Sequence, residues 1–199
     1  MHNIQFLSGE EASEALNREE GKYTLALTHN LVGGFADDYR RVTDNSPDAE
    51  IDWQPCVEHC LKSVENLKRE GNIFVVLQDG KPVGMQGYKY AGQDPTTGQG
   101  VYELAHGSIL EEAEGRGYLK KLVSLTLQNI REKHGCVHVI FGSSNKNFAE
   151  KLASRFHFEP MSLERLYQID HSKMDVSEYT QEIETKRKNG ITFYLLPGK

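Results

Sequence analysis

One strand–helix–strand unit in the middle of the chain constrains the fold more than any other feature. Within Tyr118–His134, apolar and small side chains recur at helical spacing: Leu119, Leu122, Val123, Thr126, Leu127 and Ile130. This pattern predicts an amphipathic helix that ends at Gly135. Two runs typical of strands, Val101–Leu110 and Val137–Phe141, flank the helix with short connections. The order predicts two parallel strands joined by a helical crossover.

The segment before this unit carries the signals of an antiparallel meander. Asn72–Gln78 and Pro82–Tyr90 are apolar runs on either side of Asp79-Gly80-Lys81, and Asp-Gly between apolar runs is a strong signal for a β-hairpin. A turn rich in Gly, Pro and Thr at Gly92–Gly100 then leads into Val101–Leu110. The sequence therefore predicts an α/β (α+β) protein with a mixed sheet.

The flanking segments are assigned from local propensity and turn signals. Toward the N-terminus we expect a strand at Ile4–Leu7, a helix at Glu10–Arg18 and a second helix before Phe35. A surface loop should follow at Asp37–Pro55, and a third helix at Val57–Arg69. Toward the C-terminus we expect a helix at Asn147–Arg155 and a strand at Phe158–Ile169. A polar helix at Ser177–Lys188, a turn at Asn189-Gly190 and a last strand at Ile191–Leu196 should follow.

Length and composition favour a single globular domain over residues 1–199. The chain has 38% hydrophobic and 26% charged residues, which suffices for one substantial core. Its apolar runs are far shorter than the roughly 20 residues of a membrane-spanning helix, and no secretory signal is visible, so we expect a cytoplasmic protein without a membrane partner. The formal charge of −6 disfavours nucleic acid as a partner. A homodimer is left open.

The three cysteines favour reduced thiols over a disulfide framework. Cys56, His59 and Cys60 would share one face of the helix expected at Val57–Arg69, and Cys136 is the remaining residue that could complete a metal site with them. That face also carries an apolar stripe. We therefore expect core packing there and no metal.

The turn before the central helix is the segment that points to chemistry. Gly115-Arg116-Gly117 joins a strand to the start of a long helix, and glycine lets the backbone approach a ligand closely. The first amides of a helix lack internal partners and lie at the positive end of the helix dipole, which suits a pyrophosphate. Two nucleotide-binding motifs are excluded, because no Gly-x-x-x-x-Gly-Lys-Ser/Thr occurs and Lys120 stands where Gly-x-Gly-x-x-Gly needs its third glycine.

Across roughly residues 72–160 this arrangement resembles the GNAT acetyltransferase superfamily. The family's turn, of pattern Gln/Arg-x-x-Gly-x-Gly/Ala, corresponds to Glu114–Leu119, and its later Gly-Phe-like segment corresponds to His157–Pro160. The resemblance implies a mixed central sheet, with an antiparallel meander and then a parallel crossover, and helices on both faces. It also implies transfer of an acetyl group from acetyl-CoA to an amine of a small molecule or peptide.

The resemblance implies that a set of residues in this chain contacts the cofactor. The backbone of the strand end would pair with the pantetheine arm, the turn amides would hold the pyrophosphate, and two asparagines would meet the cofactor after the next strand. These residues are Ile109, Leu110, Gly115, Arg116, Gly117, Tyr118, Leu119, Lys120, Asn145 and Asn147. Glu114 replaces the family's usual Gln or Arg, and Gly107 would mark a bulge that opens the cofactor site.

Acyl transfer to an amine needs a base, and two residues of the strand before the turn are candidates. These candidates, Glu103 and His106, have opposite parity in a regular strand, so only one of them should face the site unless a bulge intervenes. We expect Glu103 to act through water and place His106 second. The tyrosine acid frequent in the family falls on Ala153, so the thiolate would take its proton from Ser144, Tyr118 or water. Cys136 as an acyl-carrying nucleophile has no clear base partner.

Two other functions fit the same sequence. Because Ala153 and Glu114 depart from the family pattern, the sequence also fits a GNAT-like protein that binds CoA or has a regulatory role without catalysing transfer. A GNAT-fold transferase of another acyl group also remains. The acceptor substrate is not readable from the sequence.

Overall fold

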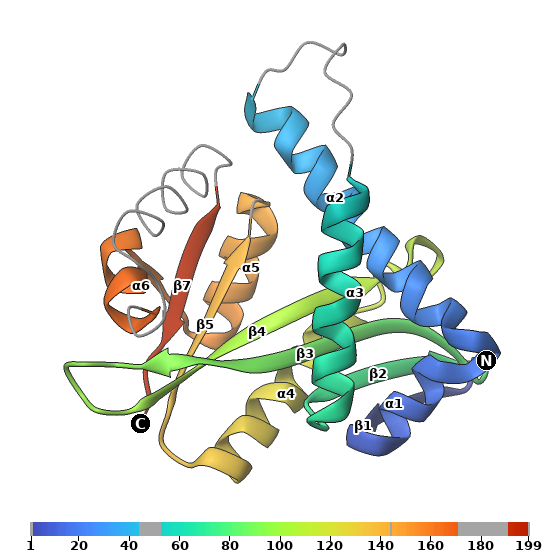
Figure 1. Ribbon diagram of the computed structural model, residues 1–199, viewed down its shortest axis with the longest axis horizontal. Helices are drawn as coiled ribbons and strands as arrows, with labels where there is room; N and C mark the ends of the chain where they lie inside the picture. The colour runs from blue at the N-terminus through green and yellow to red at the C-terminus, as the bar shows by residue number, and fades with distance from the viewer. Residues whose placement is uncertain (1, 44–52, 144, 171–190, 199) are drawn as a thin grey trace. The chain divides into compact units, whose positions relative to one another are not determined.

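The computed structural model describes residues 2–43, 53–143, 145–170 and 191–198, which form two compact units (Figure 1). The described parts of the first unit are residues 2–34, 53–89 and 104–129, and the rest belong to the second. Strands β3 (Lys81–Gln93) and β4 (Gly100–Ile109) contribute residues to both units. The two units are described separately below.

In the first unit the strand order is β1-β2-β3-β4. Strand β1 (Ile4–Ser8) pairs antiparallel with β2 (Ile73–Gln78), which pairs antiparallel with β3. Between β2 and β3, Asp79 and Gly80 have φ of 51° and 80°. Both values lie in the left-handed region that a two-residue hairpin turn requires, so the Asp-Gly prediction is confirmed.

Helices cover both faces of the first unit's strands. Helices α1 (Gly9–Asn17), α2 (Lys22–Thr43) and α3 (Gln54–Arg69) pack against one face, and a short 3-10 helix, η1 (Arg18–Gly21), joins α1 to α2. The shared core consists of Ala12, Ala15, Leu16, Leu27, Val64, Leu67, Ile73, Val75, Leu77, Met85 and Ala105. Helix α4 (Tyr118–His134) lies on the opposite face.

Two contacts place α4 on that face. The Tyr88 hydroxyl of β3 donates to Asn129 of α4 at 2.9 Å, and the rings of Phe6 and Tyr118 meet edge to face with centroids 6.3 Å apart. Phe6 pairs with Val76, whose side chain alternates away from the Val75 face. The helix that the sequence predicted over Tyr118–His134 is confirmed with the same limits.

In the second unit the strand order is β4-β5-β7-β6. Strand β5 (His138–Ser143) pairs parallel with β4 over Val101, Tyr102 and Glu103. Strand β7 (Thr192–Leu196) pairs antiparallel with both β5 and β6 (Glu159–Met161). The predicted parallel crossover and the predicted last strand are therefore confirmed, and with them the mixed α/β fold.

Helices α5 (Lys146–Phe156) and α6 (Leu163–Asp170) complete the described part of the second unit. The strand predicted over Phe158–Ile169 is wrong beyond its first residues, since β6 ends at Met161 and α6 follows. A three-residue spacing, at Leu163, Leu166 and Ile169, puts apolar side chains on one helical face that joins the core. Ser162 starts this helix, because its hydroxyl accepts a hydrogen bond from the Arg165 amide at 3.2 Å.

The loop predicted at Asp37–Pro55 is wrong at both of its ends. Helix α2 continues to Thr43, because the chain has no glycine or proline between residues 35 and 46 to end it. Helix α3 begins at Gln54, with Pro55 in its first turn, where a missing amide hydrogen is tolerated. The turn predicted at 44–48 and the predictions at 177–190 lie outside the described residues.

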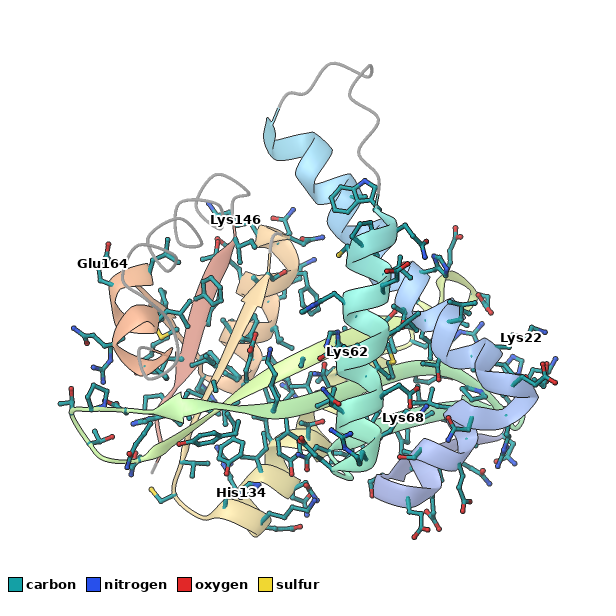
Figure 2. All side chains as sticks on the ribbon, viewed as in Figure 1. Lys22, Lys62, Lys68, His134, Lys146 and Glu164 are labelled. Carbon is teal, nitrogen blue, oxygen red and sulfur yellow. The ribbon has the colours of Figure 1, made fainter. Side chains whose placement is uncertain are left out.

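Lys22 and Lys146 lie on helix surfaces, and their ion pairs are local (Figure 2). Lys22 lies 3.2 Å from Glu19, and Lys146 lies 3.9 Å from Glu150 one turn along α5. All four side chains are more than half exposed. Exposed pairs of this kind contribute little to stability. No helix of the described residues has the length and apolar character needed to cross a bilayer.

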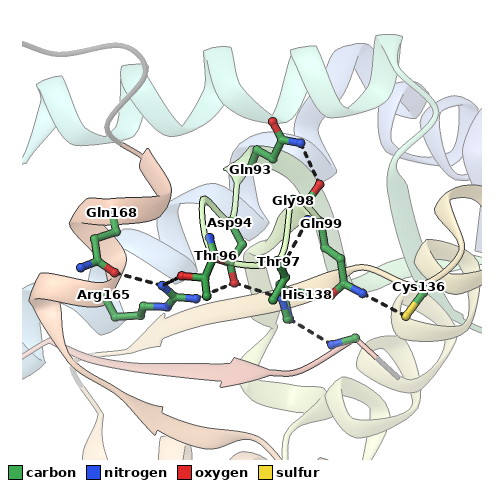
Figure 3. A network of polar contacts seen from close by, with 11 residues as sticks. Gln93, Asp94, Thr96, Thr97, Gly98, Gln99, Cys136, His138, Arg165 and Gln168 are labelled. Carbon is green, nitrogen blue, oxygen red and sulfur yellow. Dashed lines mark hydrogen bonds and ion pairs between the residues drawn. The ribbon is translucent and has the colours of Figure 1, made fainter.

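A buried carboxylate joins four segments of the second unit (Figure 3). The side chain of Asp94 is 1% exposed, and its Oδ2 accepts from Arg165 of α6 at 2.5 Å and lies 3.1 Å from His138 Nε2. Its Oδ1 accepts from the Thr96 amide at 2.8 Å. His138 Nδ1 accepts from the Gly198 amide at 3.0 Å, so Nε2 carries a hydrogen and donates toward Asp94.

Removing the cation from this network should destabilise the protein. Burial raises the pKa of Asp94, but the Thr96 amide, Arg165 and His138 outweigh it and hold that pKa below its usual range. Stability from such a carboxylate is present above the unfolded pKa and is lost as pH falls through the folded pKa. Arg165→Met leaves the buried charge without its main partner and should cost roughly 3 kcal/mol at pH 7. Because the variant's folded Asp94 pKa lies closer to the unfolded one, acidification should remove less stability from the variant, and its difference from wild type should shrink as pH falls.

Urea denaturation at pH 7 and across pH 3–5 measures both effects. Gln168→Ala is the matched control, because Gln168 accepts from the same guanidinium at 2.9 Å but is exposed. An Arg165→Met variant no less stable than this control would show that the ion pair contributes nothing.

Candidate functional site

The turn before α4 presents backbone amides without protein partners. Gly115 and Gly117 have φ of 71° and 77°, and a Cβ on either would meet no heavy atom within 4 Å. In the part of the chain that the structure describes, the amides of residues 115–120 have no protein acceptor. The next amide, of Lys121, donates to the Gly117 carbonyl at 3.2 Å. The open amides and the positive helix end together suit a phosphate group.

The Arg116 side chain is fixed beside this turn. Its Nη1 donates to Gln78 Oε1 at 2.7 Å, and its Nη2 donates to the Glu112 carbonyl at 3.0 Å. The Tyr118 hydroxyl donates to the same Gln78 oxygen at 3.4 Å. Glu114, which departs from the family pattern, is exposed. Gln78 is a site residue that the sequence did not indicate, since it lies 38 positions from Arg116.

The end of β4 is partly engaged by protein groups. The Leu110 amide donates to the Val83 carbonyl at 2.9 Å. The Ile109 carbonyl accepts from Asn30 Nδ2 of α2, also at 2.9 Å. A pantetheine arm therefore cannot use the Leu110 amide without displacing Val83, whereas the Ile109 carbonyl keeps a second lone pair beside its bond from Asn30. Asn30 is a second residue that the sequence did not indicate.

His106 occupies a strained position in β4. Its φ is 56°, in the left-handed region that costs an L-residue about 1 kcal/mol or more. Its Nε2 lies 2.7 Å from Ser63 Oγ of α3. Burial, and then the nearby Lys89 and His59, lower the pKa of His106 to about 4. The imidazole is therefore neutral at physiological pH.

Gln86 of β3 supports this distortion from the neighbouring strand. It is buried, and its Nε2 donates to the Ala105 carbonyl at 3.0 Å and to the Gly87 carbonyl at 2.8 Å. A Cβ on Gly107 would lie 2.5 Å from Gln86 Oε1. The irregularity expected at Gly107 is thus a close approach, with the left-handed residue at His106, one position earlier.

Glu103, the other base candidate, lies in the second unit and pairs with Ile140 in the parallel ladder. It is half-buried and has an interaction partner of its own. His106 and the turn at residues 115–120 belong to the first unit. The regular alternation expected between positions 103 and 106 does not hold, because the backbone leaves the strand conformation at His106.

The remaining predicted contacts lie at the start of α5 in the second unit. Asn145 Oδ1 accepts from the Phe148 amide at 3.0 Å and caps the helix, so this oxygen has a structural role. Asn147 is exposed in the first turn, and Ser144 lies outside the described residues. Ala153 is buried in the helix face, without a phenol.

The cysteines show no reactive arrangement in the described structure. Cys60 is buried, and burial followed by the neighbouring Cys56 raises the pKa of its thiol to about 11. Cys136 precedes β5 and is exposed, and its Sγ accepts from Gln99 Nε2 at 3.3 Å. The described residues contain no group of three or more His, Cys, Asp or Glu able to hold a metal ion.

Comparison with known proteins gives a consistent result. The model of the acetyltransferase (GNAT) family matches residues 36–158. The chain is similar to an acetyltransferase of the GNAT family from Staphylococcus aureus Mu50, with 14% identity, 99% of this chain and 100% of that chain covered, and a TM-score of 0.55. No curated protein matches significantly.

Two further solved structures belong to longer chains. One is N-acetylglutamate synthase from Neisseria gonorrhoeae complexed with coenzyme A and N-acetyl-glutamate, with 13% identity, 99% of this chain covered and a TM-score of 0.51. The other is a GCN5-related N-acetyltransferase from Kribbella flavida, with 12% identity, 80% of this chain covered and a TM-score of 0.49. The chain spans 35% and 33% of their lengths. At 13% and 14% identity, the likeness to the Neisseria and Staphylococcus proteins is one of fold.

Proposed function

We propose that this chain, which belongs to the acetyltransferase (GNAT) family, transfers an acetyl group from acetyl-CoA to an amine of a small molecule or peptide. The family predicted from the turn and the order of elements is confirmed by the match over residues 36–158, and with it an acetyl-CoA-dependent type of enzyme. The observation that carries the proposal for this chain is the row of open amides at residues 115–120.

The residues of the turn fit the diphosphate of CoA. Left-handed glycines with free space around them let phosphate oxygens approach the backbone, and the amides of residues 115–120 are the donors. Arg116, held by Gln78 and the Glu112 carbonyl, adds a fixed positive charge. Acetyl-CoA supplies an activated thioester.

The acceptor nitrogen attacks directly, and a side chain takes its proton. Of the two candidates we favour His106, which reverses the order expected from the sequence. A neutral imidazole at a strained backbone position, fixed by Ser63, is better prepared for this than a residue in regular strand pairing. The nitrogen becomes strongly acidic as its new bond forms, so a base with a pKa of about 4 remains competent.

Water returns a proton to the departing thiolate. The buried Ala153 offers no acid, and the Tyr118 hydroxyl donates to Gln78. Ser144 stays a prediction. The same Ala153 is the observation that favours the second candidate function, a protein that binds CoA without transfer. Transfer of a different acyl group is the third candidate function.

Acetyl-CoA should raise the melting temperature of the protein. At a concentration about 100 times the Kd, binding contributes about 2.7 kcal/mol, or roughly 5–10 °C for a chain of this size. Differential scanning fluorimetry with acetyl-CoA, CoA and ATP measures the shift and its specificity.

Thiol release with polyamines, amino acids, aminoglycosides and basic peptides then separates transfer from binding. A shift without thiol release from any amine would favour the CoA-binding alternative. No shift with either CoA compound would remove the proposal.

A further inference from the structure

We propose that Ser63 is a positioning residue for His106: its Oγ accepts the Nε2 hydrogen, so that Nδ1 takes the proton of the attacking amine. The inference rests on the proposed acetyl transfer. The amine nitrogen forms its bond to the acetyl carbon while the carbon–sulfur bond breaks and the sulfur keeps the electron pair. The proton lost by the nitrogen goes to Nδ1 and then passes through water to the sulfur. No other reactant is consumed.

Contact geometry is the first support. Ser63 Oγ and His106 Nε2 lie 2.7 Å apart, although the residues are 43 positions apart in the chain. Ser63 has a short side chain on α3, and the adjacent Val64 is fully buried in the core. Because the helix is anchored there, the serine hydroxyl offers a fixed point against which the imidazole is held.

Backbone strain at His106 is the second support. A φ of 56° is uncommon for histidine, whereas glycine or asparagine adopts it at lower cost. Gln86 holds this conformation by donating to the Ala105 carbonyl. Strain that the surrounding structure maintains occurs preferentially at functional sites. Here it directs an imidazole toward α3, where Ser63 lies.

The tautomer of the neutral His106 ring decides which of its nitrogens can act as the base. A neutral imidazole has one N–H and one lone pair, and its hydrogen-bond partner decides which nitrogen carries the hydrogen. The groups around His106 are Lys89 of β3 and His59 and Ser63 of α3, and both Lys89 and His59 disfavour its protonated form. With Nε2–H directed to Ser63, the lone pair is on Nδ1. The opposite tautomer would make His106 a donor instead of a base.

The tautomer can be measured without knowledge of the acceptor. In the full chain labelled with 15N-histidine at pH 7, we expect His106 to show the Nε2–H form, assigned by comparison with His106→Asn. Ser63→Ala should give a mixture of tautomers, and Ser63→Thr, which keeps a hydroxyl, should restore the single form. An Nδ1–H form in wild type, or no change in Ser63→Ala, would overturn the proposal.

Turnover is the second readout, with the amine found by thiol release. Loss of one hydrogen bond of about 1 kcal/mol should lower kcat roughly fivefold to tenfold in Ser63→Ala, with an unchanged KM for acetyl-CoA. Ser63→Thr should stay within about twofold of wild type on the same scale. An unchanged kcat in Ser63→Ala would also overturn the proposal.

Ser13→Ala is the matched control. Ser13 of α1 donates to the Gly9 and Lys68 carbonyls at 2.9 and 3.3 Å and does not contact His106, so its loss should change stability alone. The melting shift with acetyl-CoA tests the proposed function by itself. If acetyl-CoA gives no melting shift while the His106 tautomer still depends on Ser63, the proposed acetyl transfer is wrong and the Ser63–His106 hydrogen bond stands.

Discussion

Gly117→Val should weaken acetyl-CoA binding by roughly 100-fold to 10,000-fold. Gly117 has a φ of 77°, which a β-branched residue adopts only with strain, so the turn should change conformation. Each amide hydrogen bond to a charged phosphate contributes about 1.5–3 kcal/mol, and misdirecting two of them gives the expected loss. Titration calorimetry with acetyl-CoA measures the Kd, and circular dichroism checks that the variant is folded.

Gly135→Val is the matched control for this substitution. Gly135 follows α4, has a φ of 73°, and also has no heavy atom within 4 Å of an added Cβ. The backbone strain is therefore similar, but the residue is at the other end of the helix. It should lose comparable stability and retain the wild-type Kd. Equal weakening in both variants would mean that general strain, and not a phosphate site at residues 115–120, explains the effect.

Local signals in the sequence were sufficient for the elements around the site. The helix at Tyr118–His134 was predicted at its observed limits, because its apolar spacing is regular and glycines lie on both sides. Asp79-Gly80 gave the hairpin, because few residues other than Asp, Asn and Gly tolerate two successive left-handed positions. In such segments the conformation depends on residues close in the chain.

Errors arose where the pattern supports two structures. The segment containing Leu163, Leu166 and Ile169 is apolar enough for a strand, but the same residues also have helical spacing, and Ser162 precedes them as an N-cap. His106 was expected to follow strand alternation. A single left-handed residue changes that alternation, and a histidine does not predict a left-handed conformation.

Contacts between distant residues account for the rest of the candidate site. Gln78 reaches Arg116 across 38 positions, Ser63 reaches His106 across 43, and Asn30 reaches Ile109 across 79. Glutamine, serine and asparagine are ordinary on helices and at strand ends, so nothing in the sequence separates these three from other polar residues. Their roles depend on how helices α2 and α3 and strand β2 pack in the first unit.

The largest effect on the chemical step is expected for His106→Asn. Asparagine tolerates the left-handed conformation better than most residues, so the fold and the melting shift with acetyl-CoA should be kept. It has no basic nitrogen, and loss of general base catalysis should lower kcat roughly 100-fold to 1000-fold. Steady-state thiol release measures the effect. Glu103→Gln is the comparison and should lower kcat by less than about tenfold.

The pH profile identifies the base independently of the size of the loss. A base acts in its unprotonated form, and with a pKa of about 4 His106 is unprotonated above about pH 5, so kcat/KM should not fall on its account between pH 7 and pH 5. Lys89 lowers that pKa by charge repulsion, so Lys89→Met should raise it and move the acidic limb of the profile to higher pH. If the limb moves in Glu103→Gln instead, and His106→Asn retains most of its activity, the base is Glu103 and His106 has a structural role.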